Sequence, residues 1–73
     1  MTELYWEDDY ALALALTRAH PEANPLEVDW ATLRQWIVEL PDFADDRSVV
    51  AQYLLENIQL EWYEEVASHE SAV

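Results

Sequence analysis

The sequence predicts an all-α protein, a compact domain of three helices. Glycine is absent from all 73 residues, which disfavours tight hairpins because their turns need positive φ angles. Apolar residues recur at helical spacing in three segments that prolines and acidic turns separate. A chain of this length can build only one core. We therefore expect a single helical domain over residues 1–66 and a flexible C-terminal tail over residues 67–73.

The first helix is expected to run from Asp9 to Ala19. Four apolar residues at i, i+3, i+4 and i+7 form its buried stripe: Leu12, Ala15, Leu16 and Ala19. Pro21 ends this helix, because the residue before a proline avoids the α region. We expect His20 to cap the last carbonyls and Trp6 to close over the helix.

The second helix is expected to begin near Asp29 or Trp30 and to end at Pro41. Its buried stripe is Leu33, Trp36, Ile37 and Leu40. Ahead of it, Asn24, Pro25 and Glu27 suit the N-cap, N1 and N3 positions of a short helical turn. Core packing is the favoured role for all four tryptophans.

The third helix is expected from about Ser48 to Val66, roughly 28 Å long. Its core face is Ala51, Leu54, Leu55, Ile58, Trp62 and Val66, and Phe43 anchors the acidic connector before it. Two further rows are partly apolar, namely Tyr10 with Leu14, and Tyr53 with Asn57 and Leu60. These rows form either a wider core or an exposed contact patch, and the wider core is favoured.

Charge excludes several functions. Sixteen carboxylates oppose three arginines and no lysine, for a net charge of −13. Such a field repels nucleic-acid phosphates and anionic membranes, so we expect neither partner. The missing cysteines exclude disulfides and thiolate sites, and the missing glycines exclude phosphate-binding loops. With no signal peptide and no long apolar span, we expect a cytoplasmic protein.

One acidic cluster is a candidate binding surface. Glu61, Glu64 and Glu65 are spaced i, i+3 and i+4, so they repel one another on adjacent turns. They also fall near the expected C-terminus of the third helix, where the helix dipole disfavours negative charge. No lysine offsets them. A solvated face that keeps the protein soluble remains the equal alternative.

The other acidic groups have a simpler explanation. Glu7, Asp8 and Asp9 precede the first helix, and Asp42, Asp45 and Asp46 precede the third, where carboxylates stabilise a helix dipole. Their oxygens also suit ions such as Fe²⁺, but without a preorganised cage any binding is weak. Neither histidine has the spaced partners of a zinc site. No catalytic constellation is present, so we expect no enzymatic activity.

From Trp6 to Glu65 the chain resembles the IscX family, small acidic accessory proteins of bacterial iron–sulfur cluster assembly. The resemblance is carried by residue order and spacing and ends in a Leu-Glu-x-Ile-Gln-x-x-Trp-x-x-Glu run. The matching residues are Trp6, Asp8, Pro21, Asn24-Pro25, Trp36-Ile37, Leu40, Phe43, Asp45-Asp46, Leu55-Glu56, Ile58-Gln59, Trp62 and Glu64-Glu65. Ala11 and Leu14 depart from the acidic first helix of the family.

This resemblance implies a modified winged-helix fold and a non-enzymatic regulator. It implies binding to a basic patch of an IscS-like cysteine desulfurase and weak binding of Fe²⁺. The expected partner-binding residues are Glu61, Glu64, Glu65, Asp45, Asp46, Tyr10 and Leu14. The expected carboxylates for weak metal binding are Glu7, Asp8, Glu61 and Glu65.

Two alternatives stay open. An acidic helical protein can mimic nucleic acid and occupy the groove of a DNA-binding partner. The chain can also self-associate through Tyr10 and Leu14 with Tyr53 and Leu60, although we expect a monomer.

Overall fold

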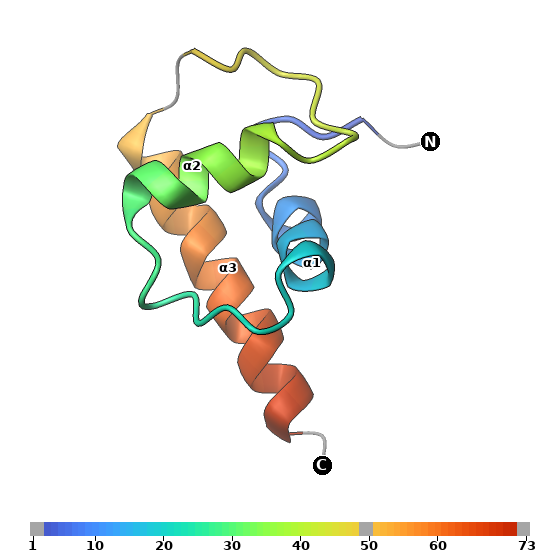
Figure 1. Cartoon of the computed structure of the whole chain (residues 1–73), viewed down its shortest axis with the longest axis vertical. Coiled ribbons are helices and arrows are strands. Elements are labelled where there is room, and N and C mark those ends of the chain that lie inside the picture. The colour runs from blue at the N-terminus through green and yellow to red at the C-terminus, as the bar shows by residue number, and fades with distance from the viewer. Residues whose placement is uncertain (1–2, 49–50, 72–73) are drawn as a thin grey trace.

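Three helices make up the fold, as the sequence predicts. The computed structural model describes residues 3–48 and 51–71, with side chains as far as residue 68. The helices are α1 (Asp9–Ala19), α2 (Trp30–Val38) and α3 (Gln52–Ser71) (Figure 1). The molecule measures 38 × 28 × 17 Å. Its long dimension reflects α3, since 20 residues of helix span about 30 Å.

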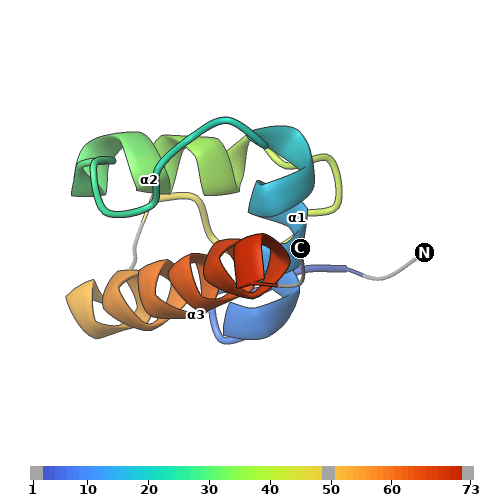
Figure 2. The ribbon, with the colours of Figure 1, turned by 90° about the horizontal axis from the view of Figure 1, so that it is seen from below.

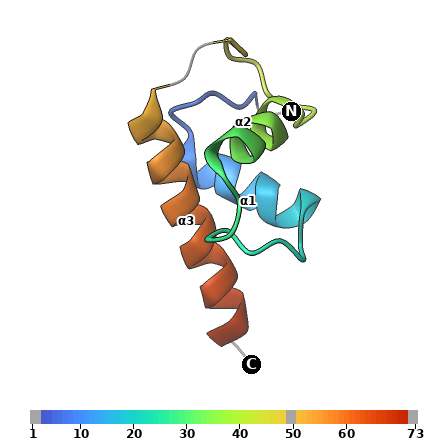
Figure 3. The same cartoon turned by 60° about the vertical axis from the view of Figure 1, so that its left-hand side comes forward.

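The longest helix supports the other two. Both α1 and α2 pack on α3, and α1 makes the more extensive contact (Figure 2). The C-terminal part of α3 extends past both of them (Figure 3).

The boundaries of α1 and α2 follow local chemistry. The predicted range of α1 is confirmed, and the backbone N–H of His20 closes it by donating to the carbonyl of Leu16 at 2.8 Å. At the start of α2, the Asp29 carboxylate accepts the backbone N–H of Thr32 at 3.3 Å, as an N-cap does. No described residue has a positive φ, in keeping with a chain that lacks glycine.

The predicted ends of α3 are wrong. The helix begins at Gln52, four residues later than expected, and continues to Ser71, five residues later. Residues 67–71 of the expected tail are therefore helical in their backbone, and residues 72–73 lie outside the described residues. The polar sequence after Val66 suggested an end, but nothing in it breaks a helix, since it holds neither proline nor glycine.

The N-terminal segment is held by the connector between α2 and α3. Leu4 and Phe43 form a parallel β-bridge, in which Leu4 donates to Asp42 and Ala44 donates to Leu4, both at 2.8 Å. The ring of Phe43 meets Trp6 edge to face, with centroids 4.8 Å apart. This bridge is the one β feature within residues 3–48 and 51–71, so the winged-helix assignment stays a prediction.

The core gathers residues from all three helices, from the N-terminal segment and from the connector between α2 and α3. It is formed by Leu4, Trp6, Leu12, Ala13, Leu16, Leu33, Ile37, Leu40, Phe43, Leu55, Ile58 and Trp62. The buried positions of Trp6, Phe43 and most of the helical stripes confirm the sequence prediction. Three predicted core residues are wrong, because Ala19, Trp30 and Ala51 are exposed. Helical spacing predicts which face is apolar but not how far the neighbouring elements reach along it.

Candidate partner-binding surface

The acidic cluster of α3 lies well inside the helix. Glu64 is exposed, and Glu61 and Glu65 are half-buried. Because α3 continues to Ser71, these residues are more than a turn from its end. The helix dipole acts within the last turn, so the predicted dipole penalty on them is wrong. Their mutual repulsion remains, and no arginine or lysine follows Arg47 in the chain.

Asp45 and Asp46 have structural roles that differ from the predicted one. They do not cap α3, which starts six residues after Asp46. The Asp45 carboxylate accepts the backbone N–H of Trp6 at 3.0 Å, and the Asp46 carbonyl accepts the Trp6 indole Nε1–H at 2.7 Å. The connector thus fixes the N-terminal segment, and Asp46 remains exposed for a partner.

Two of the three acidic residues at the start of α1 interact with the backbone near them. Asp8 is the N-cap of α1 but makes no side-chain cap bond to that helix. Its carboxylate instead accepts the backbone N–H of Tyr5 at 2.9 Å. Asp9 lies in the first turn of α1, where its charge suits the dipole, and Glu7 is exposed.

The acidic residues do not converge as a metal cage. In the described part of the chain, no three histidine, cysteine, aspartate or glutamate side chains are placed to hold one ion. The expected set of Glu7, Asp8, Glu61 and Glu65 combines the segment before α1 with α3. Carboxylate donors suit Fe²⁺, but fewer than three of them at one place leave most ligand positions to water. Weak iron binding therefore stays a prediction.

The second apolar rows are surface and not core. Tyr10, Tyr53 and Leu60 are 54%, 61% and 58% exposed, so the wider core favoured by the sequence is wrong for them. Leu14 is half-buried. Tyr5, Leu26, Trp30 and Tyr63 are exposed as well. The described surface therefore combines strong negative charge with several exposed large apolar side chains.

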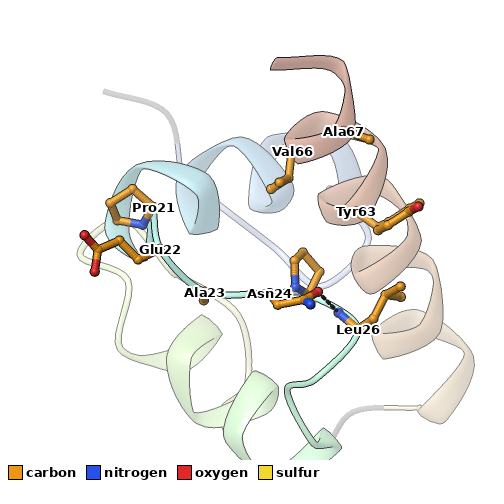
Figure 4. Close-up of a pocket in the computed structure, with 9 residues that line it drawn as sticks. Pro21, Glu22, Ala23, Asn24, Leu26, Tyr63, Val66 and Ala67 are labelled. Atoms are coloured by element: carbon orange, nitrogen blue, oxygen red, sulfur yellow. Dashed lines mark hydrogen bonds between the residues drawn. The ribbon is translucent and has the colours of Figure 1, made fainter. Parts of the chain in front are cut away.

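A groove lies between the α1–α2 loop and α3 (Figure 4). Its volume is about 330 Å³, and it is lined by Pro21, Glu22, Ala23, Asn24, Pro25, Leu26, Tyr63, Val66 and Ala67. This groove was not predicted from the sequence. The signal was available in part, since the i, i+3, i+4 spacing of Tyr63, Val66 and Ala67 puts them on one face of the helix. The loop that faces them could not be placed from sequence.

The loop side of this groove is rigidly held. The Asn24 carboxamide oxygen accepts the backbone N–H of Leu26 at 3.0 Å, and its nitrogen donates to Glu27 at 3.3 Å. The backbone N–H of Glu27 donates to the Asn24 carbonyl at 3.0 Å, which confirms the predicted turn. The side chain of Gln59 donates to the carbonyl of Pro25 at 3.0 Å and ties the loop to α3.

An aromatic column joins the α1–α2 loop to the core. The imidazole of His20 stacks on Trp36 with centroids 3.7 Å apart and planes 11° apart. Trp36 then meets the fully buried Trp62 edge to face at 6.1 Å. The side chain of His20 thus packs against α2, and the end of α1 is closed by its backbone N–H. His69 lies beyond the described side chains.

Among the described residues, three titratable groups have shifted pKa values. Hydrogen bonds from the hydroxyl and backbone N–H of Ser48 lower the pKa of the Asp46 carboxyl. Hydrogen bonding to Thr32, through its side chain first, lowers the pKa of Asp29. The hydrogen bond to Glu3, together with that carboxylate's charge, raises the pKa of the Tyr5 phenol. These shifts have local structural causes.

Fold and surface together define a small, acidic, helical protein with a groove of mixed polar and apolar lining beside an acidic helix. The family model for iron–sulphur cluster assembly matches residues 4–67 of the chain. The chain is also 42% identical over 62 residues to an uncharacterized protein of Pseudomonas aeruginosa, covering 85% of this chain and 94% of that relative. The chain belongs to the iron–sulphur cluster assembly family, and the resemblance to IscX is confirmed. None of the described helices is long and apolar enough to cross a membrane.

Proposed function

We propose that this protein is a non-enzymatic adaptor that regulates cytoplasmic iron–sulfur cluster assembly by binding a basic patch of a cysteine desulfurase. The observation that carries the proposal is the acidic cluster of α3. Glu61, Glu64 and Glu65 carry like charges at i, i+3 and i+4 on one helix, in a stretch of chain that holds no arginine or lysine. A basic surface on the partner complements these like charges, and this complementarity favours binding.

Family membership supports this reading over the nucleic-acid mimic, because it ties the chain to cluster assembly. Loose binding of ferrous iron is part of the proposal. Carboxylates are suitable ligands for this ion, and the repulsion among them would fall on binding it. Weak affinity follows from the lack of three converging ligands in the described residues.

The binding proposal is tested by neutralising the cluster. In the triple variant E61Q/E64Q/E65Q, the affinity for the desulfurase should fall about tenfold or more, since each lost charge pair contributes up to about 1 kcal/mol. Isothermal calorimetry against the purified desulfurase gives the affinity. Raising the salt concentration should weaken wild-type binding much more than binding of the variant.

The matched control removes three carboxylates elsewhere. E3Q/E39Q/D42N changes the net charge equally at exposed residues outside α3. We expect this control to bind within about twofold of wild type, because only long-range attraction is reduced. Equal losses in both triple variants would show that net charge, and not the α3 cluster, drives binding. Undiminished affinity in the α3 variant would exclude the cluster as the site.

A further inference from the structure

One side of α3 is exposed along about three turns of the helix. The exposed residues follow one another at i, i+3, i+4, i+7, i+10 and i+11, so they share one face. We call this face the outer strip of α3, and it consists of Tyr53, Glu56, Asn57, Leu60, Tyr63 and Glu64. The core residues of α3 lie on the opposite side of the helix. In Figure 3, α1 and α2 lie on one side of α3, and no other described element covers its far side.

The outer strip holds a row of large apolar side chains. Tyr53, Leu60 and Tyr63 are 61%, 58% and 42% exposed. Apolar residues scattered singly over a surface are normal and need no explanation. A row of them on one face of a helix is the pattern through which an amphipathic helix binds a partner. The strip is therefore the best candidate on α3 for a direct contact.

Charge identifies the kind of partner that covers the strip. Glu56 and Glu64 are exposed on either side of Leu60 along the helix, and no arginine or lysine follows Arg47 in the chain. A second copy of this chain would bring the same carboxylates to the strip with no cation on α3 to pair with them, which disfavours self-association. A surface whose apolar side chains are flanked by arginine or lysine complements both features of the strip.

The spacing of the strip suits a helix of that partner. Tyr53 and Leu60 are seven residues apart and alternate with Glu56 and Tyr63, which are also seven apart. Such a repeat lets two helices pack side by side at a crossing angle of about 20°. From Tyr53 to Glu64 the strip is about 17 Å long at 1.5 Å per residue, so about three turns of a facing helix cover it.

We infer that the outer strip of α3 docks on a cationic amphipathic helix, in which arginine or lysine flanks an apolar stripe. The stripe packs against Tyr53, Leu60 and Tyr63, and the cations pair with Glu56 and Glu64. The inference rests on the proposed function in taking the partner to be basic, and it deepens that function by naming the element that is bound. Of the acidic cluster, only Glu64 belongs to the strip.

Two synthetic peptides test the strip without the desulfurase. The first has three heptads with leucine at the first and fourth positions, lysine at the fifth and seventh, and glutamine elsewhere. The second has the same composition in an order that destroys the repeat. Both peptides have the same charge, so general attraction to the acidic protein is equal. We expect calorimetric titration at physiological ionic strength to show about tenfold tighter binding of the first, since only it presents one apolar stripe.

Variants of the apolar row locate the binding of the first peptide. Y53A and L60A should each weaken it about fivefold, a loss typical of a contributing interface side chain. Y53F and L60M keep the ring and the apolar bulk, and should bind within about twofold of wild type. The matched control is Y10A, which removes a tyrosine of α1 that is 54% exposed and lies outside the strip. This control should bind as wild type does.

Variants of the carboxylates test the flanking charges. E56Q/E64Q should weaken binding of the first peptide more than E39Q/D42N does. Both changes remove two negative charges, but Glu39 and Asp42 are exposed residues outside α3. Circular dichroism of each variant shows that the helices are retained.

Four results would overturn the inference. They are equal binding of the two peptides, equal losses in Y53A and Y10A, equal losses in the two charge variants, and a wild-type mass of two copies that Y53A returns to one. The same variants are then titrated with the desulfurase. If the desulfurase binds Y53A and L60A as well as wild type but loses affinity for E61Q/E64Q/E65Q, the proposed function stands and the inference falls. Selective binding of the first peptide by a protein that does not bind the desulfurase has the reverse meaning.

Discussion

At the scale of single residues, Trp6 shows how this small core uses its large aromatic side chains. Its ring is 4% exposed and packs on Phe43, while its indole N–H reaches the carbonyl of Asp46. Its backbone N–H is accepted by Asp45. One side chain therefore links the start of the chain to a connector about 40 residues away. Trp30, the first residue of α2, is 38% exposed and closes no such link.

Replacing each of these tryptophans by phenylalanine should distinguish the structural role of the buried Trp6 from that of the exposed Trp30. W6F loses one hydrogen bond and part of the packed ring, so we expect the free energy of unfolding to fall by about 1–3 kcal/mol. W30F should stay within about 0.5 kcal/mol of wild type, as exposed substitutions usually do. Urea unfolding followed by far-ultraviolet circular dichroism measures both. Equal effects would mean that the connector does not depend on Trp6.

At the other end of α1, His20 is a second residue whose ring makes a contact with a distant part of the chain. The sequence predicted that it caps carbonyls because it precedes a proline at a helix end. Its backbone does close α1, but the ring is stacked on Trp36. Stacking needs a partner from α2, 16 residues away, and no local pattern shows how that helix is placed. The contact of His20 with α2 therefore could not be predicted from the residues around it in the sequence.

At the scale of elements, local signals predicted most of the helices. Both ends of α1 (Asp9–Ala19) are predicted correctly, because an apolar stripe runs along its whole length and a proline follows it. The predicted start of α2, near Asp29 or Trp30, is also confirmed, and Asp29 is its N-cap. The ends of α3 were misplaced because its flanks carry no proline or glycine, so tertiary packing decides where it begins. The groove could not be predicted for a related reason, because one of its walls is the α1–α2 loop, whose position against α3 is set by tertiary packing.

The acidic turns at Asp29 and Asp46 should make stability depend on pH in a defined direction. Hydrogen bonds lower both pKa values below the ordinary value of 3.8, so the folded state favours the ionised forms. Their contribution is present above that value and is lost as the pH falls through the folded-state pKa values. In D29N/D46N this contribution is absent at every pH.

We therefore expect the melting temperature of D29N/D46N to lie below that of wild type at pH 7 and to approach it from about pH 5 downward. The control E39Q/D42N removes the same charge from exposed residues whose carboxylates accept no backbone hydrogen bond among those described. Its difference from wild type should reflect general repulsion alone. A constant difference between D29N/D46N and wild type across the whole range would contradict the assignment of these bonds to the ionised forms.

At the scale of the whole molecule, charge acts against folding. A net charge of −13 is confined to a body 38 Å long. At 0.01 M ionic strength the screening length is about 30 Å, so nearly all the carboxylates repel one another. At 0.15 M it falls to about 8 Å and distant pairs no longer interact. The compact state gains from screening, because folding brings these charges closer together.

Salt should consequently act in opposite directions on the stability of this protein and on its association. Raising sodium chloride from 0.01 to 0.15 M should raise the melting temperature by about 4–8 °C, the shift that about 1 kcal/mol produces in a domain of this size. The same change should weaken desulfurase binding, since attraction between opposite charges is screened as well. Calorimetric melting and binding titrations in the same buffers measure the two effects, with potassium fluoride as the control for ion-specific effects. A melting temperature that falls with salt would mean that attractive contacts outweigh repulsion, and a binding constant insensitive to salt would remove the reason for so acidic a surface.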